Sequence, residues 1–215
     1  MEVINVGLAV LIIGESGAGK SASLRNFKKG EIGVFSLHKT RLPFRTDIKP
    51  VCMSNMAYSE RYDVIKSAMM KNQKEIKTFV IDDSDYLMFF EQQQRSNEGG
   101  YGKFTEIASH LIELNKFIQM LDDDVIVYFL NHVEKDDTGK KKAITAGKMI
   151  DNQLGTFEAL FEIAILCDVR DGEHVFITNT DGSSTAKTPI GMFEDEIIDN
   201  DLKLVDKTIR EYFGM

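Results

Sequence analysis

The sequence predicts an α/β fold with a mostly parallel central sheet, and two observations carry this prediction. Beta-type runs alternate with helical patterns along the chain, which is typical of βαβ units. Three of these runs are continuously apolar, as strands buried on both faces of a sheet are. The 215 residues contain no internal repeat and no low-complexity linker, so we expect one domain over residues 1–215.

The elements are expected in the following order. Strands are predicted at Leu8–Ile13, Ile32–Ser36, Thr78–Ile81, Val125–Leu130, Leu160–Leu166 and His174–Thr178. The first, third and fourth of them are the apolar runs and should be central. Helices are predicted after Gly19 and over Ser59–Met70, Lys103–Leu121 and Glu194–Phe213. Loops are predicted over 92–102, 133–147 and 181–189, which are polar or glycine-rich.

Spacing and composition separate core from surface. The helix from Lys103 carries an apolar stripe at spacings of three and four residues, which predicts a core face: Phe104, Ile107, Ala108, Leu111, Leu114, Ile118 and Leu121. Cys52 and Cys167 lack the spacing of a metal or redox motif, so we expect buried thiols. No apolar run approaches the roughly 20 residues of a membrane span. Glu2 replaces a basic signal-peptide start, which favours a cytoplasmic protein with no membrane contact.

The net charge of −8 argues against a protein that coats nucleic acid by bulk charge. The charge is unevenly distributed, however. Residues 20–77 hold 13 basic and 5 acidic side chains, a net +8, which leaves −16 for the rest of the chain. Nucleic acid held locally therefore remains possible.

The segment Gly14–Ser21 matches G-x-x-x-x-G-K-[ST] between a predicted strand and a predicted helix. Its backbone N–H groups and the following helix start should cradle phosphates, with Lys20 reaching the β- and γ-phosphates and Ser21 binding Mg²⁺. The expected nucleotide-binding residues are Gly14, Glu15, Ser16, Gly17, Ala18, Gly19, Lys20, Ser21 and Ala22.

Polar residues follow two other apolar strands. Asp82 and Asp83 end the strand from Thr78, which has the form of a Walker B element: Asp82 is expected to hold Mg²⁺, and Asp83 is a candidate base for the attacking water. In one branch of P-loop proteins a later strand inserts between the P-loop and Walker B strands. Val125–Leu130 is the candidate. Asn131 and His132 at its end could then hydrogen-bond the γ-phosphate or the attacking water, and His132 is the candidate catalytic sensor beside Lys20.

Five segments together resemble the short RecA-like ATPases of bacteriophages: Gly14–Ser21, Val80–Met88, Val125–Glu134, Thr145–Asn152 and Thr185–Leu202. The similarity covers nearly the whole chain, and the last two segments are more particular to this phage group than the first two. The resemblance implies a three-layer P-loop NTPase fold with a bare RecA-like core, binding of ATP and Mg²⁺, and a location in the host bacterial cytoplasm. It also implies a role in annealing-type recombination beside a single-strand-binding protein.

One position departs from that family. RecA-type cores place a glutamate just after the second strand, whereas here the residues are Phe35–Lys39, without an acid. Hydrolysis should therefore use Asp83 or another group, or be slow. A cation from a neighbouring subunit completes such sites, and Lys148 and Lys187 are candidates in a homo-oligomeric ring or filament.

Single-stranded DNA is the expected partner, and loops 92–102 and 133–147 are its predicted contacts. Arg95, Tyr101, Lys103 and the lysines at 140–142 offer phosphate contacts and a stacking surface. The basic series from Lys28 to Lys49 could instead face the acidic stretch 191–215 of another subunit. Two further functions stay open: a P-loop phosphotransferase, and a nucleotide-gated binding module with little hydrolysis.

Overall fold

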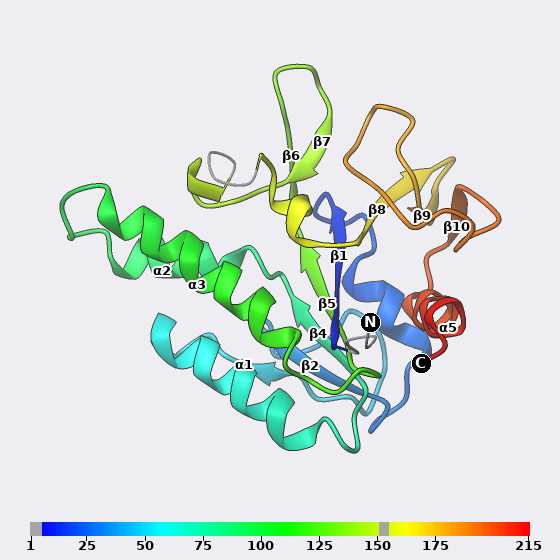
Figure 1. Cartoon of the computed structure of the whole chain (residues 1–215), viewed down its shortest axis with the longest axis horizontal. Helices are drawn as coiled ribbons and strands as arrows, with labels where there is room; N and C mark the ends of the chain where they lie inside the picture. The colour runs from blue at the N-terminus through cyan, green and yellow to red at the C-terminus, as the bar shows by residue number, and fades with distance from the viewer. Residues whose placement is uncertain (1–5, 151–154) are drawn as a thin grey trace, which may run out of the picture.

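The computed structural model describes residues 6–150 and 155–215. Within them, eight strands form one sheet in the order β10-β9-β8-β1-β5-β4-β2-β3 (Figure 1). The run from β8 to β3 is parallel, and β9 and β10 add to one edge in antiparallel fashion. The strands are β1 (Leu8–Gly14), β2 (Ile32–Ser36), β3 (Val51–Cys52), β4 (Thr78–Asp82), β5 (Ile126–Asn131), β8 (Ile163–Arg170), β9 (Glu173–Ile177) and β10 (Ile197–Asp199).

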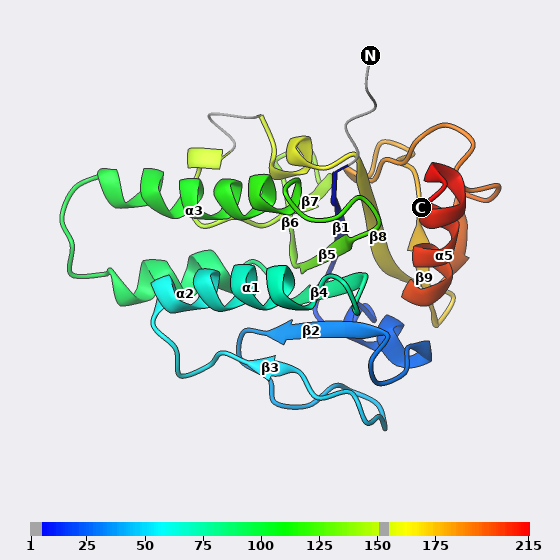
Figure 2. The ribbon, with the colours of Figure 1, turned by 60° about the horizontal axis from the view of Figure 1, so that its bottom comes forward.

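Helices cover both faces of this sheet (Figure 2). Alternate side chains of each strand enter two separate cores, as the two-residue period of a strand requires. On β5, Val127 and Phe129 pack with α1 (Tyr58–Asn72), α2 (Tyr86–Gln94) and α3 (Gly102–Ile118). Ile126, Tyr128 and Leu130 face the other core with the 3-10 helix η1 (Ser21–Asn26) and α5 (Leu202–Phe213).

The predicted insertion of the strand from Val125 is confirmed. β5 lies between β1 and β4, with Ile13 opposite Asn131 and Asp82 opposite Leu130. The three apolar strands are central, and the α3 stripe is core, with six of its residues buried and Phe104 partly buried. Because these strands are parallel, the residues that follow β1, β4, β5 and β2 meet at one edge of the sheet.

Several element boundaries were wrong. The predicted helix 194–213 is β10 followed by α5, because Ile197 and Ile198 pair with β9 and Asp201 caps the helix by accepting hydrogen bonds from the backbone N–H groups of Lys203 and Leu204. The predicted strand from Leu160 starts at Ile163, since residues 157–160 form the 3-10 helix η2 (Phe157–Leu160). The helix after Gly19 is only the short η1.

Two predicted loops contain regular structure. Residues 133–147 include a hairpin of β6 (Val133–Lys135) and β7 (Lys141–Ala143), closed by a turn in which Asp136 accepts hydrogen bonds from the backbone N–H groups of Thr138 and Lys140. α2 was not predicted, and it occupies residues 92–94 of the other loop. In the described part of the chain, no helix has the length and apolar character needed to cross a membrane.

Candidate nucleotide-phosphate site

The segment Gly14–Ser21 turns sharply at the carboxyl end of β1. Gly17 and Gly19 have φ angles of +82° and +108°, which glycine adopts without steric cost. A Cβ at Gly14 would lie 2.6 Å from the carbonyl oxygen of Cys167 on β8, so this glycine allows close packing of the loop on its neighbour. Nothing lies within 4 Å of a Cβ built at Gly17, so the outer side of the loop faces open space.

Lys20 closes this loop from the inside. Its side chain is 5% exposed, and its ammonium donates hydrogen bonds to the carbonyl oxygens of Gly14 at 2.7 Å and Glu15 at 3.1 Å. Burial lowers the pKa of Lys20, although nearby negative groups, Asp83 first, act in the opposite direction. A buried ammonium bonded to neutral carbonyls gains from an added anion. The loop is therefore suited to a phosphate group.

Ser21 and Asp82 meet across the sheet edge. The Ser21 hydroxyl donates a hydrogen bond of 2.7 Å to Oδ1 of Asp82. Burial, followed by the charge of Asp83, raises the pKa of the Asp82 carboxyl. A hydroxyl and a carboxylate oxygen are hard donors, and Mg²⁺ is typically held by few protein oxygens with phosphate and water completing its shell. These two side chains fit that ion.

Asp83 lies in a strained turn directly after β4. Its φ of +58° is in the left-handed region, where backbone strain is a feature of functional sites. Its carboxylate is buried and lies 2.6 Å from Nζ of Lys39, three residues after β2. Burial lowers the pKa of Lys39, but the hydrogen bond and charge of Asp83 outweigh burial, so the net shift is upward. Lys39 thus places a cation beside Asp83, in a segment after β2 that contains no acid from Phe35 to Lys39.

His132 connects two buried acids. Its Nδ1 lies 3.1 Å from both carboxylate oxygens of Asp85, and its Nε2 lies 3.7 Å from Oδ1 of Asp83. Asp85 also accepts a hydrogen bond from the backbone N–H of His132. Asp85 therefore fixes the orientation of the imidazole, and a proton on Nδ1 directs the other ring nitrogen toward Asp83.

Asn131 ends β5, as predicted, and its side chain forms hydrogen bonds within the chain. The side chain is fully buried, accepts a hydrogen bond from the Ser84 hydroxyl, and donates two, to the carbonyl oxygens of His132 and Ile144. These contacts join the end of β5 to the turn after β4 and to the hairpin. These bonds give Asn131 a positioning role, and its predicted contact with nucleotide stays a prediction.

Cys167 on β8, His174 on β9 and Asn200 directly after β10 lie against the loop or against each other beside it. The sequence did not predict these contacts. His174 Nδ1 and the Cys167 thiol both donate to the carbonyl oxygen of Ala18, at 2.8 Å and 3.1 Å. The Asn200 side chain donates to Cys167 Sγ, and burial raises the pKa of that thiol to about 12. Their contact with the loop comes from pairing of distant strands, for which the local sequence carries no signal.

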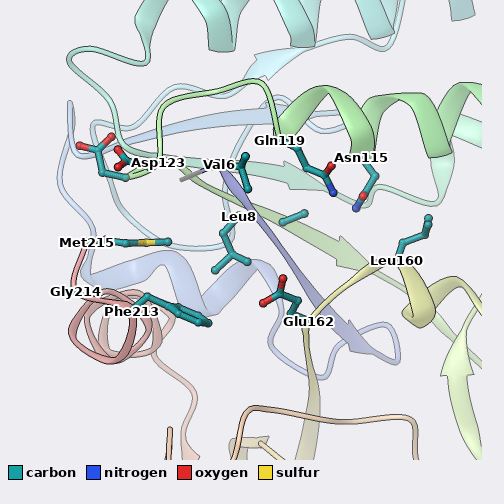
Figure 3. Close-up of a pocket in the computed structure, with 13 residues that line it drawn as sticks. Val6, Leu8, Asn115, Gln119, Asp123, Leu160, Glu162, Phe213, Gly214 and Met215 are labelled. Atoms are coloured by element: carbon teal, nitrogen blue, oxygen red, sulfur yellow. The ribbon is translucent and has the colours of Figure 1, made fainter. Parts of the chain in front are cut away.

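Some of these residues line one pocket of about 240 Å³. Its lining consists of Ser16, Gly17, Gly19, Lys20, Ser21, Ala22, Lys39, Pro43, Asp83, His132 and His174, and the buried Asp82 lies behind Ser21. A larger pocket of about 410 Å³ lies at the opposite end of β1 (Figure 3). Leu8, Leu160 and Phe213 contribute to its lining, and it contains none of the phosphate-binding residues. The smaller pocket is the candidate site because the charged and strained residues converge there.

Most of the predicted DNA-contacting cations have partners within the chain. Arg95 pairs with Glu91, Glu98 and Glu106 and is 8% exposed. Lys103 donates to two backbone carbonyls, Lys141 pairs with Asp168, and Lys142 pairs with Glu134. Tyr101 is 87% exposed, and Lys148 and Lys187 are exposed at the surface. Asp151 and Asn152, which end the segment Thr145–Asn152, lie outside the described residues.

Comparison of the chain with protein-family models and with curated proteins found no match. The assignment of the site therefore rests on its own geometry.

Proposed function

We propose that the chain is an ATP-binding protein with a RecA-like P-loop core and a slow, Mg²⁺-dependent ATPase activity. The observation that carries the proposal is the contact between Ser21 and Asp82 beside the buried ammonium of Lys20. A glycine-rich loop, a lysine, a hydroxyl and a strand-end carboxylate are the protein groups that bind the phosphates and magnesium of ATP. The position of β5 between β1 and β4 also supports this type of core.

The chemistry follows from the residues around the pocket. The loop and Lys20 hold the phosphates, and Ser21 and Asp82 hold Mg²⁺, which offsets charge on the phosphate oxygens when it is bound. Water attacks the γ-phosphorus, the bond to the β–γ bridging oxygen breaks, and ADP leaves. Asp83 accepts the proton that the water loses, and His132, oriented by Asp85, lies beside it. Because Lys39 neutralises Asp83, we expect turnover to be slow.

The proposed role of the ATPase is in phage DNA recombination or replication on single-stranded DNA. Its test measures phosphate release with and without single-stranded DNA, and it includes product analysis. We expect phosphate to be released to water and turnover to rise several-fold with DNA. A rate of turnover that does not change when DNA is added would contradict the DNA role. A phosphorylated acceptor among the products would indicate a phosphotransferase instead.

A second candidate is a nucleotide-gated binding module. The ion pair between Lys39 and Asp83 favours it, because a carboxylate oxygen that already contacts an ammonium at 2.6 Å is less free to contact an attacking water. Tight ATP binding without phosphate release, with or without DNA, would support this candidate over the ATPase.

Lys39 should distinguish ATP from ADP. It lines the phosphate pocket and pairs with Asp83, next to the proposed magnesium ligand, so we expect it to contact the γ-phosphate of bound ATP. We expect Lys39→Gln to weaken ATP binding by about tenfold, because one charge-assisted contact is lost, and to leave ADP binding within about twofold. Titrations with both nucleotides test this, with exposed Lys71→Gln on α1 as control. Equal effects on ATP and ADP would contradict the assignment.

A further inference from the structure

The segment between β2 and β3 carries a group of cations outside the phosphate pocket. Residues 38–50 contain Lys39, Arg41, Arg45 and Lys49 against a single acid, Asp47. In the described part of the chain, Arg41, Arg45 and Lys49 form no ion pair and no side-chain hydrogen bond. This distinguishes them from Arg95, Lys141 and Lys142, whose charges acids of the same chain offset.

The segment surrounds an open hollow of about 960 Å³. Arg41, Phe44, Arg45, Thr46 and Lys49 are among the residues that line it. Figure 2 shows the segment at the margin of the molecule, beside the edge strand β3. The hollow therefore combines three exposed cations with one acid, Asp47, a hydroxyl and the half-buried ring of Phe44.

The backbone of the segment is held in place. Leu42 and Ile48 are buried in the same core as β1 and β5, while Arg41, Arg45 and Lys49 remain exposed. The Thr46 hydroxyl accepts a hydrogen bond from the backbone N–H of Ile48. Two apolar anchors thus present the cations on a fixed loop, which lowers the ordering cost of binding a polyanion.

The same segment reaches the nucleotide pocket. Lys39 and Pro43 line the phosphate pocket, and Lys39 holds Asp83. A ligand on Arg41, Arg45 and Lys49 would lie on a loop whose first cation is in contact with the proposed hydrolytic base. Binding at the hollow and the state of the nucleotide can therefore influence each other through this loop.

From these observations we infer that residues 38–50 bind the phosphodiester backbone of single-stranded nucleic acid. Cations along a groove with an aromatic surface are the means by which single strands are held without sequence preference. An acidic face of a second copy is the competing occupant: three acids of residues 191–215 are engaged within the chain, but the exposed Glu194, Asp195, Glu196 and Asp199 form no ion pair among the described residues, so the test below also measures the oligomeric state. The inference deepens the proposed function by assigning the surface for its partner.

The test uses the full chain and a labelled oligothymidylate of about 30 nucleotides, followed by fluorescence anisotropy over a range of salt concentrations. The test variant is Arg41→Gln/Arg45→Gln/Lys49→Gln. A control with the same loss of charge is Lys66→Gln/Lys71→Gln/Lys116→Gln, on α1 and α3. The loss of three phosphate contacts should make the negative slope of log K against log salt shallower by about 2. It should also weaken binding about a hundredfold at 0.1 M salt. The control should bind like the wild type.

A second variant, Lys135→Gln/Lys140→Gln in the β6–β7 hairpin, separates the two candidate surfaces. Loss of binding in the hairpin variant with retention in the segment variant would overturn the inference. The inference would also be overturned if the wild type did not bind the oligonucleotide. The same holds if the segment variant changed only its oligomeric state, measured by light scattering, and kept its affinity for the oligonucleotide. ATP binding is measured on the same samples. If it is intact, the segment variant is folded, and a failure of the inference leaves the proposed nucleotide site standing.

Discussion

Lys20→Ala should abolish nucleotide binding and reduce ATP turnover to background. The ammonium is buried inside the loop, and the carbonyl oxygens it contacts belong to the residues that would surround the phosphates. Removing a charge-assisted contact to phosphate from a buried site costs about 3 kcal/mol or more, which corresponds to at least a hundredfold in affinity. Calorimetric titration with ATP and a phosphate-release assay measure the two effects.

The control for Lys20→Ala is Lys71→Ala, which removes an exposed lysine on α1 with the same change in net charge. It should leave both properties unchanged. Wild-type affinity in Lys20→Ala, in a sample with native far-UV circular dichroism, would contradict the phosphate role of the loop.

Asp82→Asn should separate stability from function. The amide can still accept a hydrogen bond from Ser21, but it is a poor ligand for Mg²⁺, so we expect turnover to fall about a hundredfold or more and the stimulation of ATP binding by Mg²⁺ to be lost. In the absence of nucleotide the variant should be more stable than the wild type, because a buried carboxylate beside Asp83 is removed. A gain of about 1 kcal/mol would raise the melting temperature by about 2–4 °C for a chain of this size.

The pH dependence of that gain has a defined sign. The folded pKa of Asp82 lies above its ordinary value of 3.8, so protonation of this group stabilises the fold at low pH, and this contribution is lost as the pH rises through the folded pKa. Asn is neutral throughout. The stability advantage of Asp82→Asn should therefore be small at or below pH 3.8 and grow toward neutral pH. A constant difference in thermal melts over this range would contradict the raised pKa.

The parts of the site that lie within one contiguous motif could be predicted from the sequence. Gly14, Lys20 and Ser21 are fixed by the spacing of the loop, and Asp82 follows an apolar run whose length and composition indicate a central strand. The position of β5 was also predictable, because apolar strands buried on both faces belong in the middle of a parallel sheet.

Residues that reach the site through the folding of distant segments could not be predicted in this way. Lys39 lies in a loop after β2, and its role depends on the strained turn that brings Asp83 toward it. His174 is near the loop because it lies at the start of β9, directly after the turn at the carboxyl end of β8, where it pairs with Val169. Asp85 had a local signal, since it continues the acidic run after β4, but its partner His132 is known only from the pairing of β4 with β5.

The most direct test of the central proposal is an equilibrium titration of the wild-type chain with ATP in the presence and absence of Mg²⁺. If the loop 14–21 and Asp82 form a magnesium–nucleotide site, one ATP should bind per chain, and Mg²⁺ should strengthen binding by about tenfold or more. An absence of saturable ATP binding, or an affinity that does not change with Mg²⁺, would contradict the proposal.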